Sequence, residues 1–320
     1  TFMLRSALNR EEPGIPCRLP VGDSPWICVP KALQHILDGW NVLKRCVTLP
    51  RFKQKSSHRH HHQYRATGRN PSIPLGRFLG QRIYRGVTTG LNDAFVIDKR
   101  TRDHLIKTHA DSEKIIKPMV RGENLHPWYQ EQIDSYLIFT RRGVDIDSYP
   151  AIKEYLKQFR KRLAPCPPNR KDGEDWPGRK RGTYHWYEIQ DAVDYYNVFE
   201  QPRIHSTKIS LYPAFSFSQE VLYASNTSYI LPVADAQVGY YLLGLLNSHV
   251  CEYFCRQVFS AKANGYYEIQ PGRLADFPIP DAPAAERDAI GTLAMQITDV
   301  ARARYALHQR VRHRIQSDVG

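Results

Sequence analysis

The stretch that first fixes the organisation of this chain covers residues 83–98 and reads Ile83-Tyr84-Arg85-Gly86-Val87-Thr88-Thr89-Gly90-Leu91-Asn92-Asp93-Ala94-Phe95-Val96-Ile97-Asp98. A short apolar run enters it, two glycines follow, and a second apolar run leaves it. Because glycine adopts the backbone angles of tight turns at little cost, this order predicts a strand, a glycine turn and a returning strand. We therefore expect order to begin near Leu75, with a hairpin-like unit here.

Downstream of this unit, helix and strand signals alternate. Asp98 or Thr101 is a candidate cap for a short helix through residues 104–107, and Ser112 for another through Ile116 that Pro118 ends. Further strands are predicted at residues 135–140, near Ile204, and at residues 215–217, 221–223 and 229–231, and further helices at residues 149–163, 239–247 and 250–259. The pattern predicts a mixed α/β (α+β) fold of short strands and packed helices.

A long helix is predicted after the sequence Phe277-Pro278-Ile279-Pro280, which closes the body of the chain. It starts at Pro283 and runs to about Ile315, with apolar residues that recur mostly every three or four positions: Ile290, Leu293, Ile297, Val300, Leu307 and Val311. One apolar face on an otherwise charged helix indicates packing against another helix or a partner.

The positive charge of the chain is concentrated in one region. The formal net charge is +13, and residues 41–90 contain 11 Lys and Arg without any acidic residue. Residues 1–75 are rich in proline and include the run His58-Arg59-His60-His61-His62, so we expect a poorly ordered segment. That run is either a solvated basic linker, which we favour, or an open site for metal or phosphate. The rest of the chain is nearly neutral, so a polyanion surface there requires local clustering of cations.

Composition also restricts the compartment and the class of protein. No run approaches the roughly 18 apolar residues that a membrane-spanning helix needs, and no secretory signal is evident at the start. The six cysteines are scattered without a CxxC pair, which favours reduced thiols and a cytoplasmic protein. Cys251 and Cys255, four apart on an apolar helix, are interpreted as core residues.

Motifs for catalysis are absent from the sequence. We find no glycine-rich dinucleotide, P-loop or S-adenosylmethionine motif, no Asn/Asp-Pro-Pro-aromatic motif, and no metalloprotease or serine hydrolase motif. The nearest approach to a nuclease is Asp111-Ser112-Glu113-Lys114, which lies at a predicted helix start where acids act as caps. We predict no catalytic residue and no metal site in this chain.

Three loops combine glycine, aromatic residues and hydrogen-bond donors. The first loop covers residues 84–92, the second residues 117–124 and the third residues 176–187. Arginine and asparagine read base edges and lysine contacts phosphates, so these loops are candidates for binding double-stranded DNA. The predicted DNA-facing residues are Arg85, Thr88, Thr89, Asn92, Lys117, Arg121, Asn124, Arg179, Lys180, Arg181, Tyr184 and His185, together with Asn264 and Tyr266 of a later turn.

A family resemblance runs in order through about residues 75–285. It rests on Arg85-Gly86-Val87-Thr88-Thr89-Gly90-Leu91-Asn92-Asp93-Ala94-Phe95, Ile116-Lys117-Pro118, Arg121-Gly122-Glu123-Asn124, Arg142-Gly143-Val144-Asp145, Trp186-Tyr187-Glu188, Leu243-Gly244-Leu245-Leu246-Asn247-Ser248 and Phe277-Pro278-Ile279-Pro280. These motifs resemble the TaqI-type C-terminal specificity domain, the target-recognition part of Eco57I-like and type IIG adenine-specific DNA methyltransferases and restriction-modification proteins. The end of the domain is similar to type I specificity subunits, in which recognition domains pass into long helices.

The resemblance implies a division of the chain and a function. Residues 1–75 would be the poorly ordered segment, residues 76–282 a DNA target-recognition domain, and residues 283–320 the C-terminal helix. The complete family protein would methylate adenine N6 with S-adenosylmethionine on a flipped-out base. This chain, which lacks the methyltransferase motifs, would need no cofactor of its own and would recognise the sequence for a methyltransferase domain or subunit.

Two other functions remain open at this stage. The chain is alternatively an enzyme itself, as a complete or degenerate S-adenosylmethionine-dependent DNA methyltransferase or as a nuclease subunit. It is otherwise an interaction protein that docks a methyltransferase through the helix at residues 283–315. The recognised DNA sequence does not follow from the amino-acid sequence.

Overall fold

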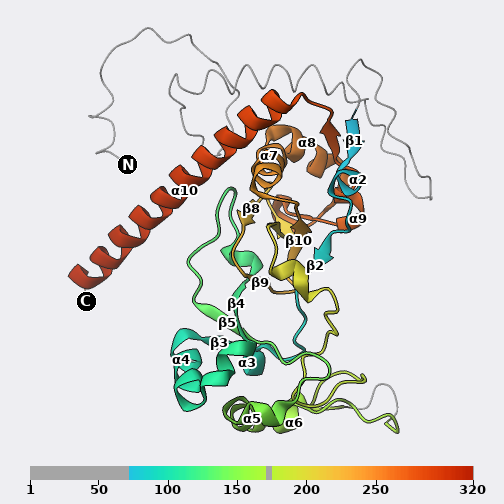
Figure 1. Ribbon diagram of the computed structural model, residues 1–320, viewed down its shortest axis with the longest axis vertical. Helices are drawn as coiled ribbons and strands as arrows, with labels where there is room; N and C mark the ends of the chain where they lie inside the picture. Colours follow the sequence, from blue (N-terminus) through green and yellow to red (C-terminus); the bar gives the residue numbers. More distant parts are fainter. Residues whose placement is uncertain (1–71, 171–174, 320) are drawn as a thin grey trace. The chain divides into compact units, whose positions relative to one another are not determined.

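The computed structural model describes residues 72–170 and 175–319 (Figure 1). The predictions for residues 1–71, including the basic histidine run, lie outside the described residues. Ser72–Pro74 form strand β1, which pairs antiparallel with β13 (Pro278–Pro280). The Leu75 side chain behind it is completely buried, so the described fold includes residues directly before 76.

One hydrophobic core surrounds a four-stranded sheet. The sheet has the order β3-β5-β4-β9, in which only the β4–β9 pair is parallel, and its strands are β3 (Val96–Asp98), β5 (Ser135–Ile138), β4 (Ile116–Val120) and β9 (Tyr223–Ala224). The helical elements of this part are α3 (Asn92–Phe95), α4 (Lys99–Thr108), η2 (Ala110–Ile115), η3 (Gly122–Asn124), η4 (Ile146–Ser148), α5 (Pro150–Lys157), α6 (Arg160–Leu163) and η5 (Tyr196–Phe199). Phe95, Leu137 and Ile152 are fully buried in this core.

Capping residues explain where the helices of this part start. Asp98 caps α4, because its Oδ1 accepts a hydrogen bond of 2.8 Å from the Thr101 amide. Pro150 occupies the first turn of α5, where its missing amide hydrogen costs nothing. The single helix predicted over residues 149–163 is divided into α5 and α6, because Phe159 leaves helical angles.

The predicted hairpin at residues 83–98 is wrong. The entering strand β2 (Tyr84–Arg85) pairs with β10 (Ser228–Pro232), while β3 pairs with β5. Between them, residues 92–95 form the helical turn α3, which begins where the Thr89 hydroxyl donates to Asn92 Oδ1 over 2.7 Å. Apolar runs therefore flank the glycines as predicted, but each run finds its strand partner in a distant part of the chain.

A second hydrophobic core lies under a second four-stranded sheet, of order β2-β10-β6-β8. The remaining strands of this sheet are β6 (Arg203–Thr207) and β8 (Phe215–Ser218), and the helices of this core are α2 (Leu75–Leu79), α7 (Ala236–Leu246), α8 (His249–Val258) and α9 (Pro271–Leu274). Gly239 of α7 permits close packing on the sheet, because an added Cβ would lie 2.4 Å from the Phe217 ring. Cys251 and Cys255 are fully buried here, as the apolar spacing predicts.

The opposite face of β6 and β8 carries a buried polar layer. Arg203, His205 and Ser216 have no exposed surface, and β6 pairs with β8 so that His205 lies opposite Ser216. Both ring nitrogens of His205 lack a hydrogen-bond partner. Burial, reinforced by the Arg203 charge, holds the pKa of His205 well below its ordinary 6.5, and the imidazole is neutral at pH 7.

A small sheet and a long helix complete the described chain. The three-stranded sheet has the order β11-β12-β7 and is formed by β11 (Ser260–Ala261), β12 (Tyr267–Glu268) and β7 (Ile209–Ser210), with η6 (Ala263–Gly265) at the tip of its hairpin. The helix predicted after Pro283 is α10 (Ala284–Val319), and it packs on α7, where Ile290 faces Gly244. Farther along, Val300 is 70% exposed and Ile315 57% exposed.

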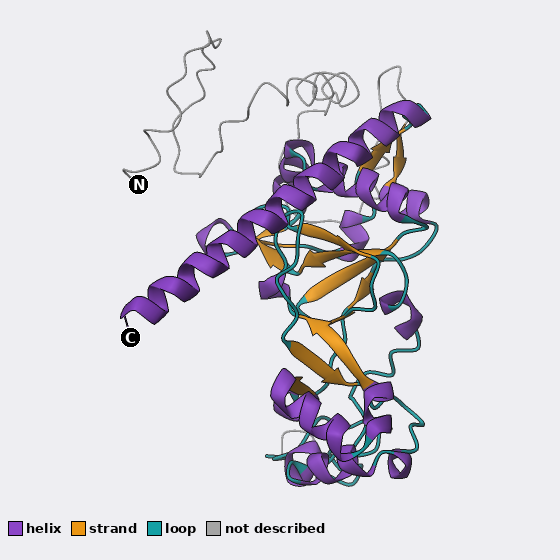
Figure 2. Ribbon diagram, turned by 60° about the vertical axis from the view of Figure 1, so that its left-hand side comes forward, coloured by secondary structure: helices purple, strands orange, loops and turns teal. Residues whose placement is uncertain are grey.

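The observed architecture confirms the predicted mixed α/β class. Short strands, long connecting segments and packed helices alternate along the described chain (Figure 2). The strands predicted near Ile204, Phe215 and Tyr229 are present as β6, β8 and β10. Pro118, which we expected to end a helix, lies instead inside strand β4.

Candidate nucleic-acid interface

The first loop is fixed to a β-turn at Ser225–Ser228, between β9 and β10. The Gly86 amide donates to the Ser228 carbonyl over 3.0 Å, and the Val87 amide donates to the Ala224 carbonyl over 2.7 Å. An added Cβ at Gly86 would lie 2.0 Å from the Ser225 carbonyl oxygen, closer than any side chain can approach. Glycine is therefore required here by a backbone contact between segments about 140 residues apart.

The second loop is fixed to the other side of the same turn. The Ser225 amide donates to the Val120 carbonyl over 3.0 Å, which continues the parallel pairing of β4 with β9. The Gly122 amide donates to Thr227 Oγ1 over 2.9 Å, and a Cβ at Gly122 would lie 2.5 Å from the Thr227 carbonyl oxygen. Residues 85–87, 120–122 and 225–228 therefore lie side by side; we call these residues the loop junction. In Figure 1 they lie around β2, β9 and β10.

The loop junction presents two predicted arginines at the surface. The Arg85 side chain is 53% exposed and lies 3.3 Å from Asp191, and the Arg121 side chain is 43% exposed and lies 3.6 Å from Glu123. Exposed ion pairs of this kind contribute about 0–1 kcal/mol, so a phosphate or base edge can compete for either guanidinium.

Sequence analysis did not identify the third segment of the junction, the turn Ser225–Ser228. Asn226 and Thr227 are exposed at its tip, and Lys208 next to it donates its amide to the Thr227 carbonyl over 2.9 Å. A Ser-Asn-Thr-Ser run between two apolar strands is a turn signal, but its own composition does not reveal its position between two other loops.

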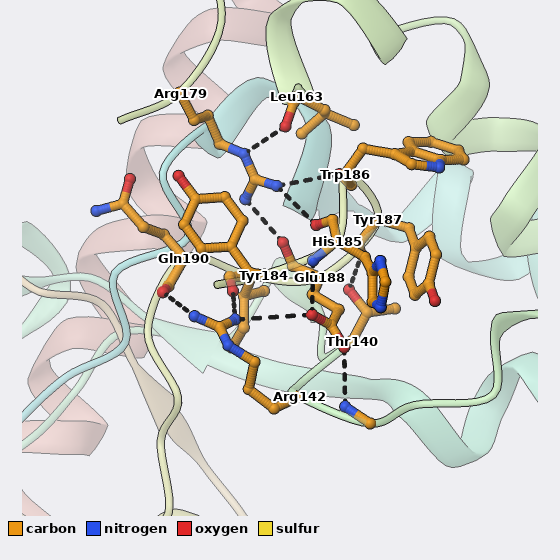
Figure 3. Close-up of polar contacts among 12 residues, drawn as sticks. Thr140, Arg142, Leu163, Arg179, Tyr184, His185, Trp186, Tyr187, Glu188 and Gln190 are labelled. Atoms are coloured by element: carbon orange, nitrogen blue, oxygen red, sulfur yellow. Dashed lines mark hydrogen bonds and ion pairs between the residues drawn. The ribbon is translucent and has the colours of Figure 1, made fainter. Parts of the chain in front are cut away.

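Arg179 of the third loop is buried, which corrects its prediction as a base-reading residue. The residue is 3% exposed, and its guanidinium donates five hydrogen bonds, one for each of its N–H groups (Figure 3). All five acceptors are main-chain carbonyls, those of Leu163, Thr89, Glu188, His185 and Trp186, at 2.7–3.2 Å. Arg179 therefore supports the loop from inside and has no donor left for DNA.

The charge of Arg179 is retained inside the protein. Burial lowers its pKa from 12.5 to about 10, so the guanidinium stays positive at pH 7. Its central carbon lies 4.4 Å from the centre of the Tyr184 ring, which adds a cation–π contact. The Tyr184 side chain is buried at 5% exposure and its hydroxyl donates to the Lys180 carbonyl, so Tyr184 is also corrected to a structural position.

The same network connects two motifs that lie apart in the sequence, those around Arg142 and Glu188. Arg142 donates to the carbonyls of Ile189 and Gln190 at 2.5 and 2.7 Å (Figure 3). The Glu188 carboxylate, 2% exposed, accepts from the Gly143 amide and from the His185 amide, each at 2.8 Å. The sequences around Arg142 and Glu188 are therefore parts of one scaffold that holds the third loop.

The first loop is also attached to this scaffold. The Thr89 carbonyl accepts from Arg179 and from the Gln190 amide, and the Thr88 amide donates to Asp191 Oδ2 over 3.0 Å. Thr89 is only 1% exposed, so its prediction as a DNA-facing residue is wrong as well. Thr88 is half-buried, and Asn92 is exposed but accepts the Thr89 hydroxyl hydrogen bond.

The other predicted residues differ in their exposure and in the contacts that their side chains make. Lys180, Arg181 and His185 are exposed, Arg181 donates to the Arg170 carbonyl over 2.6 Å, and His185 stacks on Tyr187. In the second loop, Lys117 lies 4.0 Å from Glu200, and Asn124 donates to Glu131 over 2.9 Å.

Asn264 and Tyr266 lie at the tip of the β11–β12 hairpin and are both exposed, with Asn264 in the left-handed region at a φ of 58°. The base of this hairpin approaches the loop junction, because the Ile269 amide donates to the Lys208 carbonyl over 2.9 Å. Lys208, which also donates its amide to the Thr227 carbonyl, therefore links the hairpin to the turn Ser225–Ser228.

The acidic residues considered for a nuclease are occupied by cations. Asp111 lies 2.8 Å from Lys114, and Glu113 lies 3.6 Å from Arg102. Within residues 72–170 and 175–319 there is no cluster of three or more His, Cys, Asp or Glu side chains that could hold a metal ion. None of the helices in these ranges has the length and hydropathy of a membrane-spanning segment.

A mixed α/β scaffold that presents several glycine-containing loops around a common turn is the arrangement expected of a recognition domain. The family model of the TaqI-like C-terminal specificity domain matches residues 117–279, which is just over half of the chain. The chain therefore belongs to the family of TaqI-like C-terminal specificity domains, as its motifs indicated.

The solved structures that are similar to this chain include the two described below. The type IIL restriction-modification enzyme MmeI, in complex with DNA, covers 73% of this chain with a TM-score of 0.49 and 18% identity. The type IIG restriction endonuclease BpuSI covers 70% with a TM-score of 0.42 and 10% identity. This chain corresponds to 28% of the MmeI chain and 26% of the BpuSI chain. A comparison with curated proteins gave no match.

Proposed function

We propose that this chain is the DNA target-recognition module of a restriction-modification system, and that it binds double-stranded DNA through the loop junction. Membership of the specificity-domain family supports this function. The observation that carries the assignment of the surface is the convergence of two loops and a turn on backbone hydrogen bonds, with Arg85 and Arg121 exposed at their edge. A rigid backbone with exposed arginines matches what base-edge recognition requires.

The other exposed cations and amides would contribute mainly to positioning. Lys180, Arg181 and Lys117 would contact phosphates, and Asn264 with Tyr266 would extend the surface from the hairpin tip. His185, Thr88, Asn92 and Asn124 are at least partly accessible and remain part of the proposed surface. Arg179, Thr89 and Tyr184 are no longer included, because they are buried.

The parent protein would methylate adenine at N6, and the methyltransferase domain or subunit would lie outside this chain. A hollow of about 430 Å³ lies beside Gly76, Gly80 and Arg82. Its positively charged arginine is unsuited to the sulfonium cation of S-adenosylmethionine. Another hollow, of about 320 Å³, is lined by Glu131, which already accepts from Asn124 and His126. We therefore place the cofactor in neither of these two hollows and propose that it binds to the methyltransferase domain or subunit.

Selection from a random duplex pool with the full chain tests the proposed function directly. We expect a defined sequence to be enriched, and anisotropy titrations should show tighter binding to it than to random duplex. The double variant Arg85→Ala/Arg121→Ala should weaken binding to the selected site by at least tenfold, because each good arginine–base pair contributes about 1–3 kcal/mol.

The matched control is Arg100→Ala/Lys107→Ala, which removes two exposed cations from α4. It changes the net charge by the same amount as the double variant of the loop junction. Because these two cations lie outside the loop junction, the affinity for DNA should stay within twofold of that of the unmodified chain. If the unmodified chain enriches no sequence and binds no duplex at low salt, the proposed function is wrong. If both double variants lose affinity equally, bulk charge rather than the loop junction carries binding.

A further inference from the structure

Asn226 is an exposed residue of the loop junction, and the residues on both sides of it are held by hydrogen bonds. It is the second residue of the β-turn Ser225–Ser228, which is closed by the Ser228 amide donating to the Ser225 carbonyl over 3.0 Å. Side chains lock the same turn, because Ser225 Oγ and Thr227 Oγ1 lie 2.6 Å apart and Ser228 Oγ donates to the Ser225 carbonyl over 2.7 Å. The backbone under Asn226 therefore has little freedom.

The segments on either side of this turn prevent it from shifting. The Gly86 amide holds Ser228, the Gly122 amide holds Thr227, and the Lys208 amide holds the Thr227 carbonyl. Ser225 lies in β-bridge pairing with Val87. A loop that is held by three separate segments pays little ordering entropy when it binds, and it places its side chains reproducibly.

The Asn226 side chain itself is uncommitted. It is exposed, and within the described part of the chain its amide group forms no hydrogen bond. By contrast, the two asparagines predicted in the first and second loops are occupied: Asn92 accepts from Thr89, and Asn124 donates to Glu131. Among these three asparagines, only Asn226 offers both a free donor and a free acceptor.

We infer that Asn226 is a specificity-determining residue that reads an adenine in the major groove of the target duplex, an assignment that rests on the proposed function. Its Oδ1 would accept from adenine N6, and its Nδ2 would donate to adenine N7, which is the bidentate pairing that a planar amide makes with this base. Arg85 and Arg121 flank the turn on its two sides and would contact guanine edges or phosphates of the neighbouring base pairs.

The experiment compares the sequences selected from a random duplex pool by the full chain and by two variants. Asn226→Ala should remove the preference at one adenine position and leave the other positions unchanged, with a loss of roughly 5- to 150-fold in affinity for the selected site. Asn226→Asp keeps the shape but only accepts hydrogen bonds, so it should lose adenine and favour cytosine, whose N4 donates, at the same position.

The matched control is Asn169→Ala, which removes an exposed asparagine elsewhere on the chain and should select the same sequence as the unmodified chain. If the unmodified chain selects a defined sequence and Asn226→Ala selects it unchanged with equal affinity, the inference is wrong while the proposed function stands. A change of preference at a guanine position would overturn the assignment to adenine. If the unmodified chain binds no DNA, both fail together. Circular dichroism melting of each variant shows whether the fold is retained.

Discussion

The third loop and the loop junction each contain an arginine next to a glycine, Arg179 and Arg85. The surroundings of these two arginines differ completely. Arg179 is 3% exposed and its five donors are all used by main-chain carbonyls. The Arg85 side chain is 53% exposed and has one carboxylate at 3.3 Å. A basic residue in a loop therefore does not by itself indicate DNA contact. Whether main-chain carbonyls already accept its hydrogen bonds must be known first.

The comparison also separates two kinds of rigidity. In the third loop a charged side chain fixes the backbone around it, whereas in the loop junction the backbone segments fix one another and leave Arg85, Arg121 and Asn226 exposed. Substitutions should consequently affect stability in the first region and recognition in the second.

The largest expected effect is that of Arg179→Met. It removes all five donors and leaves the buried carbonyls of Leu163 and Glu188 without partners, so the free energy of unfolding should fall by on the order of 3–5 kcal/mol. Urea denaturation followed by circular dichroism measures this loss. Arg85→Met is the matched control and should change stability by less than about 0.5 kcal/mol. Equal stabilities of the two variants would contradict the distinction.

Gly86→Ala is expected to have the next largest effect. The new methyl group would lie 2.0 Å from the Ser225 carbonyl oxygen, so the first loop must separate from the turn, at a cost of about 1–3 kcal/mol in stability. Gly272→Ala is the control, because an added Cβ at Gly272 meets no atom within 4 Å. Thermal melting compares the two variants, and a Gly86→Ala variant as stable as the control would show that the segments are not held together.

The buried polar layer on β6 and β8 gives a smaller, pH-dependent effect. The pKa of His205 is depressed in the folded chain, so the unfolded chain takes up the proton first and stability falls as the pH drops below about 6.5. A histidine that stays neutral when folded lowers the free energy of unfolding by on the order of 1 kcal/mol at pH 5.5 relative to pH 7.5. His205→Leu should reduce this pH dependence. Urea denaturation at pH 7.5 and 5.5 tests it, and an unchanged slope in the variant would assign the dependence to other groups.

The smallest effect is expected for Lys180→Ala. This side chain is exposed and forms no network, so stability should stay the same, while binding to random duplex should lose about one unit of salt dependence if the lysine contacts a phosphate. Anisotropy titrations between 50 and 200 mM salt are sufficient to detect such a change. A variant with an unchanged salt slope would place Lys180 outside the interface.

Much of the fold was predictable from periodicity and caps. Asp98 starts a helix and the residues after Pro283 form the long helix, because capping and heptad-like spacing act locally. The partner of β2 was not predictable, since Tyr84 and Arg85 pair with Ile230 and Tyr229, far away in the sequence. No local pattern encodes such a pairing.

The candidate site was predicted less completely, for the same reason. Gly86 and Gly122 each permit a close backbone contact, but this contact was not predicted, because the segment that approaches them, Ser225–Ser228, reads as an ordinary turn. Arg179 was misassigned because a basic triplet between aromatic residues is equally compatible with a surface patch and with one arginine pointing inward.

The acceptors around Arg179 have a consequence for how this domain diversifies. A main-chain carbonyl is present at every position whatever the side chain, so the exposed His185 and the half-buried Trp186 can be exchanged without removing an acceptor of the guanidinium. Evolution, or a designer of altered target sites, can therefore vary these two side chains while Arg179 preserves the path of the backbone.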